Sequence, residues 1–127
     1  SINALVDIDT QTKEIIVKKF LQTNTNYFLI KSDSEIVGAI RIVSLENKEL
    51  CRISPIFILP EHQNKGIAQI VFQEIEKIFK PQKGWILETI NEEKGNCHLY
   101  EKVGYRKTGN IDKIKEGMNL VHYKKEK

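Results

Sequence analysis

The chain has 127 residues, of which 40% are hydrophobic and 29% charged, and its net charge is +3. This composition is typical of one globular domain and excludes a disordered chain. Its apolar runs fall short of the ~18 residues that span a bilayer, and no signal peptide opens it, so we expect a cytoplasmic protein with no membrane partner. The weak, dispersed positive charge also argues against a nucleic-acid partner.

The residues that could bind metal or form disulfides are scattered. Cys51 and Cys97 lie far apart without CxxC spacing, so we expect two reduced thiols. The three histidines show no ligand spacing, so we expect no metal site.

The first third of the chain is expected to contain a helix and a β-hairpin. Apolar residues recur at helical spacing over Thr12–Gln22, and Asp9 or Thr10 can cap the start of that helix. Tyr27–Lys31 and Ile36–Val43 are rich in β-forming residues and are joined by a short polar turn, which predicts a hairpin.

The middle of the chain combines a strand with the most regular helix. Cys51–Leu59 is the next expected strand, and Gly66–Phe79 is an amphipathic helix that ends before Pro81 and Gly84. Its apolar residues fall on one face: Ile67, Ile70, Val71, Ile75, Ile78 and Phe79.

The last third is expected to alternate strands and one helix. Trp85–Ile90 is apolar nearly throughout and predicts a central strand, and Asn96–Lys102 predicts a short helix stopped by a glycine. Gly104–Thr108 and Met118–Lys124 are expected to be strands, with Asn110–Gly117 as the loop between them. The whole chain, residues 1–127, therefore predicts a single α+β domain around a mixed sheet.

The segment that links Cys51–Leu59 to the long helix has the features of an anion-binding site. A helix N-terminus offers unpaired N–H groups and a partial positive charge, and Gly66 and Ala68 leave the backbone accessible. The turn has no GKS or GKT and only one glycine, which excludes a P-loop and a dinucleotide fingerprint. The alternative is an ordinary strand-to-helix turn.

A second segment, NCHLYEKVGY (residues 96–105), places a tyrosine on a short helix near the sheet. The phenol of Tyr100 is a weak acid that could protonate a leaving thiolate. The alternative is a core tyrosine with a hydrogen-bonded hydroxyl.

In this order, with WILETI between them, ILPEHQNKGIA and LYEKVGY resemble two motifs of the GNAT superfamily of acyl-CoA-dependent N-acyltransferases. The resemblance runs from the hairpin at Tyr27 to the last strand. It implies a mixed, mostly antiparallel sheet of about six or seven strands, splayed in the middle and flanked by helices on both faces. It also implies acetyl-CoA as the acetyl donor.

The resemblance also implies roles for individual residues. The backbone of Phe57 and Ile58 would pair with the pantetheine arm, Asn96 would reach the same arm through its side chain, and Tyr100 would be the general acid. The CoA pyrophosphate would lie on the backbone of Gln63, Asn64, Lys65, Gly66, Ile67 and Ala68.

The general base is not specified by the resemblance. Glu88, on the strand that faces the gap, is the candidate that accepts the amine proton, directly or through water. A solvent-facing or lysine-paired carboxylate is the alternative for Glu88, and Glu49 or main-chain carbonyls are competing bases.

Acetyl transfer to a primary amine by direct attack in a ternary complex is the function that these residues imply. The alternative is a non-catalytic module of the same fold that binds or senses acyl-CoA. Family members usually have a strand and two helices before the hairpin, so we expect a shortened or incomplete N-terminal part here. A small-molecule amine and a protein amine both stay open as acceptors, and so does a homodimer.

Overall fold

The computed structural model describes residues 2–10, 13–22 and 24–127, and the side chains from residue 24 onward. No helix in these ranges is both long and apolar enough to cross a membrane. In chain order the elements are β1 (Ile2–Thr10), β2 (Lys13–Gln22), β3 (Thr25–Ser32), β4 (Glu35–Leu45), β5 (Leu50–Ile58), α1 (Ile67–Ile78), β6 (Trp85–Ile90), α2 (Lys94–Lys102), β7 (Arg106–Lys115) and β8 (Met118–Lys125), with 3-10 turns at Glu46–Lys48 and Pro60–His62.

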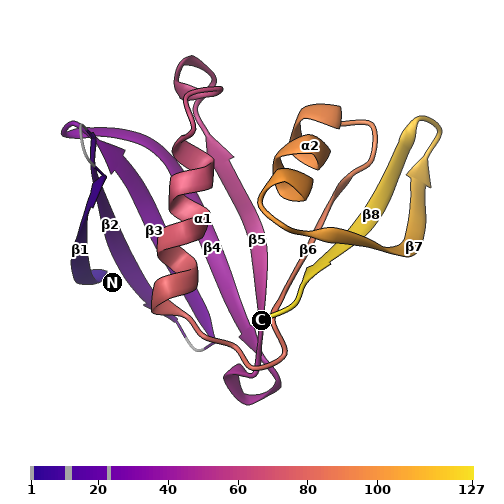
Figure 1. The fold of residues 1–127 in the computed structure, drawn as a ribbon, viewed down its shortest axis with the longest axis horizontal. Coiled ribbons are helices and arrows are strands. Elements are labelled where there is room, and N and C mark those ends of the chain that lie inside the picture. Colours follow the sequence, from indigo (N-terminus) through magenta and orange to yellow (C-terminus); the bar gives the residue numbers. More distant parts are fainter. Residues whose placement is uncertain (1, 11–12, 23) are drawn as a thin grey trace.

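All the strands belong to one sheet, in the order β1-β2-β3-β4-β5-β6-β8-β7 (Figure 1). Among the described strands, β5 and β6 pair in parallel and every other neighbouring pair is antiparallel. The mixed, mostly antiparallel sheet is therefore confirmed. The described residues form eight strands rather than six or seven, because the N-terminal part contributes two.

The helix expected over Thr12–Gln22 is wrong for the residues that the structure describes. Lys13–Gln22 forms strand β2, which pairs with β1 on one side and β3 on the other. The run Ile15-Ile16-Val17 consists of β-branched residues, which favour extended backbone. Pairing along both edges of the strand then outweighs a weak helical periodicity. Thr12 lies outside the described residues.

The other expected elements agree with the structure, with one exception near the C-terminal end. The loop expected at Asn110–Gly117 is wrong, because β7 continues to Lys115 and forms a hairpin with β8. All ten residues of β7 are exposed. They therefore lack the buried/polar alternation by which a strand is recognised.

The sheet splays between its two central strands. β5 and β6 are paired over only three positions, from Cys51 opposite Trp85 to Ile53 opposite Leu87. Beyond this point β5 continues for five residues and β6 for three without pairing to each other. The expected gap between these strands is confirmed, and it opens toward the N-termini of both helices (Figure 1).

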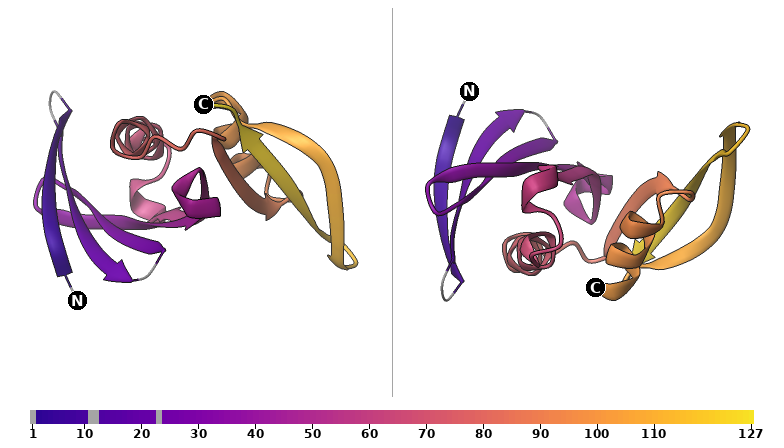
Figure 2. Two further views of the ribbon diagram at one scale, coloured as in Figure 1. Left: turned by 90° about the horizontal axis from the view of Figure 1, so that it is seen from below. Right: turned by 90° about the horizontal axis from the view of Figure 1, so that it is seen from above.

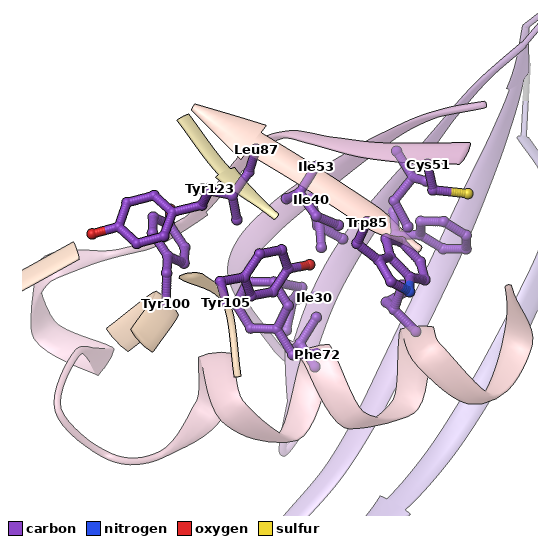
Figure 3. Packing of buried hydrophobic residues seen from close by; sticks show 14 of the residues in the cluster. Ile30, Ile40, Cys51, Ile53, Phe72, Trp85, Leu87, Tyr100, Tyr105 and Tyr123 are labelled. Atoms are coloured by element: carbon purple, nitrogen blue, oxygen red, sulfur yellow. The ribbon is translucent and has the colours of Figure 1, made fainter. Parts of the chain in front are cut away.

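Both described helices pack on one face of the sheet rather than on two (Figure 2). Phe72 of α1 and Tyr100 of α2 contact each other edge to face, with ring centroids 6.0 Å apart. Tyr100 also packs against Tyr105 and Tyr123, so four aromatic rings join the two helices to the C-terminal strands (Figure 3). Both helices thus bury their apolar faces in one continuous core, which also contains Cys51 and Cys97 as free thiols.

Candidate acetyl-CoA site

A cavity of about 840 Å³ lies at the open end of the splay. Its walls come from the end of β5, from the loop that leads into α1, from the first turn of α1, and from α2 along its length. It brings together all the residues predicted to bind the cofactor and the predicted general acid: Phe57, Ile58, Gln63, Asn64, Lys65, Gly66, Ile67, Ala68, Asn96 and Tyr100.

The start of α1 presents free backbone N–H groups to this cavity. Gly66 caps the helix with φ +79°, a left-handed conformation that favours glycine, and the first helical hydrogen bond runs from Ile70 N–H to the Gly66 carbonyl (3.2 Å). The N–H groups of Ile67, Ala68 and Gln69 therefore precede the helical ladder and border the cavity. An anion placed here would also meet the positive end of the helix dipole.

The loop before α1 is held in place by the side chain of Gln63. Its Nε2 donates a hydrogen bond to the carbonyl of Ile58 (2.9 Å), and its own backbone N–H donates to the carbonyl of Pro60 (3.2 Å). Gln63 thus ties the loop to the end of β5. The preceding residue, His62, anchors the loop to β4, because its Nε2 lies 2.6 Å from Oε1 of Glu35.

A second helix N-terminus borders the same cavity. Gly95 and Asn96 belong to the first turn of α2, and both line the cavity together with Leu99 and Tyr100. Asn96 was predicted to belong to this site, whereas Gly95 and Leu99 were not. The sequence does contain a signal for Leu99: Leu99 and Tyr100 lie three and four residues after Asn96, so the three residues share one helix face.

The charge of the cavity suits a polyanionic ligand. Two lysines, Lys65 and Lys102, and two histidines, His62 and His98, line it, and no aspartate or glutamate is among its described lining residues. Lys102 and His98 are four residues apart and so share one helix face, but they carry no other signal in the sequence. Together with two helix N-termini, the two lysines give a site of positive potential.

Along β5, the backbone N–H and C=O groups of successive residues point alternately toward β4 and toward the gap. Leu59 N–H donates to the Val37 carbonyl of β4 (2.8 Å), and a Cβ added to Gly38 would lie 2.3 Å from the Phe57 carbonyl oxygen. Phe57 therefore directs its backbone toward β4. Ile58 directs its backbone toward the gap, because successive residues of a strand alternate.

Tyr100 lines the cavity and is 7% exposed. Its hydroxyl makes no hydrogen bond with a described residue, in contrast to Tyr123, which donates to Oε2 of Glu101 (2.7 Å). Burial raises the pKa of Tyr100 above its ordinary value, and the nearby Cys97 raises it further. The phenol is thus fully protonated at neutral pH and can donate its proton into the cavity.

Glu88 lies outside this cavity. Trp85, Leu87 and Thr89 of β6 face the core, so the intervening Glu88 points to the opposite face of the sheet. There its carboxylate lies 3.7 Å from Nη1 of Arg52 and 3.8 Å from Nδ1 of His122. The sequence therefore did not reveal that the candidate acid and base lie on opposite faces of the splayed strands.

Known protein families and structures match this arrangement. The acetyltransferase (GNAT) domain family matches residues 6–127. A comparison with curated proteins gives no significant match. A GNAT acetyltransferase from Elizabethkingia anophelis with bound acetyl-CoA has 21% sequence identity and a TM-score of 0.68, covering 83% of this chain and 78% of its own.

Two further solved structures share the fold. IAA acetyltransferase from Bacillus cereus is 18% identical with a TM-score of 0.71, covering 83% of this chain and 79% of its own. Spermidine/spermine N-acetyltransferase SpeG from Vibrio cholerae is 18% identical with a TM-score of 0.68, covering 81% of this chain and 65% of its own. Because the family match extends over almost all of the chain, this protein belongs to the GNAT acetyltransferase family.

Proposed function

We propose that this protein transfers the acetyl group of acetyl-CoA to a primary amine by direct attack in a ternary complex. The observation that carries the proposal is the cavity at the splay, which is lined by two helix N-termini, by Lys65 and Lys102, and by the buried, protonated Tyr100. The pyrophosphate would contact the N–H groups of Lys65 to Ala68, and Asn96 would reach the pantetheine arm.

The pantetheine arm would continue the sheet into the gap. The backbone of Ile58 is turned toward the gap, and that of Phe57 toward β4. We therefore narrow the strand-like pairing with pantetheine to Ile58, with Phe57 contributing its side chain rather than its backbone. Gln63 would fix the end of β5 in this position.

The chemistry is a single acyl transfer. The amine nitrogen attacks the thioester carbonyl carbon, and the C–S bond breaks when the tetrahedral intermediate collapses. The CoA thiolate takes the phenolic proton of Tyr100, and the ammonium proton passes to Glu88, directly or through water. Holding both reactants at the gap lowers the entropic part of the barrier.

The test is the release of CoA thiol from acetyl-CoA in the presence of a panel of primary amines, measured for the wild type and for Tyr100→Phe. Acetyl transfer predicts amine-dependent release that the substitution reduces. CoA binding, measured by calorimetry, should be the same in both proteins. Tight CoA binding without thiol release for any amine would instead identify a non-catalytic acyl-CoA-binding module.

A further inference from the structure

The backbone of the loop that leads into α1 makes mostly local hydrogen bonds. His62 N–H donates to the carbonyl of Leu59 (2.8 Å), and Gln63 N–H donates to that of Pro60 (3.2 Å). Bonds of this kind set the shape of the turn, but they do not fix its position relative to the sheet. The position of the free N–H groups that follow in α1 therefore depends in part on contacts made by the side chains of the loop.

The side chain of His62 connects this loop to a distant segment of the chain. Its Nε2 lies 2.6 Å from Oε1 of Glu35, the first residue of β4, which is 27 residues away in the sequence. An ionised carboxylate can only accept a hydrogen bond, so Nε2 of His62 is the donor. The side chain of His62 is only 19% exposed, whereas that of Glu35 is 66% exposed. An exposed acid thus holds a half-buried histidine that also lines the cavity.

Glu35 is itself placed by a tight turn between β3 and β4. Asp33 and Ser34 have φ angles of +51° and +69°, as in a two-residue hairpin turn, and Ser32 pairs directly with Glu35 across it. Because β4 is antiparallel to β5, its first residues lie at the same end of the sheet as the loop (Figure 1). The hairpin therefore offers the loop a fixed point of attachment.

The charge of Glu35 by itself would oppose the binding of CoA. Glu35 is not among the described residues that line the cavity, but it contacts one that does. A carboxylate near a site for a polyanion lowers the positive potential there, so its removal should tighten binding if charge alone counted. If Glu35 instead holds His62 and the loop in place, its removal should weaken binding. The sign of the change in the Kd for CoA separates these two effects.

We infer that Glu35 is a positioning residue for the acetyl donor. Through His62 it holds the loop that leads into α1 in the conformation that binds CoA, although it is acidic and lies outside the cavity. This inference rests on the proposed function, because it requires the CoA pyrophosphate to lie on this loop. It assigns Glu35 to donor affinity and not to the chemical step.

The first test is the Kd for CoA, measured by calorimetry. Glu35→Ala should raise this Kd about three- to ten-fold, because a charge-assisted hydrogen bond is lost. Glu35→Gln removes the same charge but keeps an acceptor oxygen, so it should restore most of the affinity. Glu61→Ala is the matched control, because it removes an exposed carboxylate of the same loop that does not line the cavity, and it should not weaken binding. An unchanged or lower Kd in Glu35→Ala, or equal weakening in Glu35→Gln, would overturn the inference.

The second test asks whether Glu35 acts through His62. In a double-mutant cycle, the variant with both Glu35→Ala and His62→Ala should bind CoA no more weakly than His62→Ala alone. Losses that simply add would overturn the inference. In steady-state kinetics, Glu35→Ala should raise the KM for acetyl-CoA and leave kcat and the KM for the amine unchanged. A lower kcat with an unchanged KM for acetyl-CoA would also overturn it.

The outcomes separate this inference from the proposed function. Weaker CoA binding in Glu35→Ala, without thiol release by the wild type for any amine, would leave the positioning role standing and refute the proposed acetyl transfer. Amine-dependent thiol release, with a Kd for CoA that Glu35→Ala does not change, would do the reverse. Absence of CoA binding to the wild type would overturn both.

Discussion

Replacing Tyr100 by phenylalanine removes one oxygen atom and separates the chemical step from folding and binding. The hydroxyl has no hydrogen-bond partner among the described residues, and the ring keeps its contacts with Phe72, Tyr105 and Tyr123. The free energy of unfolding should therefore change by less than about 1 kcal/mol. A general acid contributes about 10²–10⁴-fold, so kcat should fall by that factor, which corresponds to about 2.7–5.5 kcal/mol in the barrier.

Tyr105→Phe is the matched control for this prediction. Tyr105 is buried in the same aromatic cluster, and its hydroxyl is also without a described partner, but it does not line the cavity. Its substitution should leave kcat unchanged. Thiol release with a saturating amine gives kcat, calorimetry gives the Kd for CoA, and thermal unfolding gives stability. A kcat of Tyr100→Phe within about three-fold of the wild type, or an equal loss in Tyr105→Phe, would refute the role of Tyr100.

Three more outcomes follow from the site. Gly66→Ala places a side chain at φ +79°, which costs roughly 1–2 kcal/mol of stability. The added Cβ has no protein atom within 4 Å, so a weaker Kd for CoA would report contact with the ligand. An unchanged Kd would contradict the pyrophosphate site. Glu88→Gln should lower kcat/KM at pH 7 about ten-fold or more. The kcat/KM of this variant should recover as the pH approaches the pKa of the amine, because the amine then loses its proton without a base. A pH profile parallel to that of the wild type would exclude Glu88 as the base. Burial raises the pKa of Tyr105 in the folded state, so the folded protein holds more protons than the unfolded chain above pH ~10. The free energy of unfolding should therefore fall as the pH rises through this range, and the melting temperature of Tyr105→Phe should fall less than that of the wild type. Equal slopes of melting temperature against pH in the two proteins would contradict the raised pKa of Tyr105.

Much of the fold could be predicted because local signals and burial agree. The helix from Ile67 to Ile78 places its apolar residues on one face, and Trp85–Ile90 is buried on alternate residues. β2 could not be assigned correctly, because Ile15-Ile16-Val17 fits a short amphipathic helix and a doubly paired strand equally well, and the choice depends on its partners β1 and β3.

The grouping of the proposed cofactor-binding residues around one cavity could be predicted because it is local in sequence. One strand, one turn and one helix start supply most of its backbone groups, and the tyrosine follows in the next helix. The position of the predicted base relative to the cavity could not, because it depends on which residues of β6 face the core. Trp85, Leu87 and Thr89 do, so Glu88 lies on the opposite face.

The order of the strands also affects when the nascent chain, as it leaves the ribosome, can begin to bind acetyl-CoA, the proposed donor. β6 touches β5 over three residues, yet it pairs along its whole length, Trp85–Ile90, with β8, which follows all the other strands in sequence. The loop that leads into α1 and both helix starts are thus translated before β8, the strand that fixes α2 to the rest of the sheet. Nascent chains that lack Met118–Lys125 should leave the two walls of the cavity unconnected, so co-translational binding of acetyl-CoA should begin only after this strand has emerged.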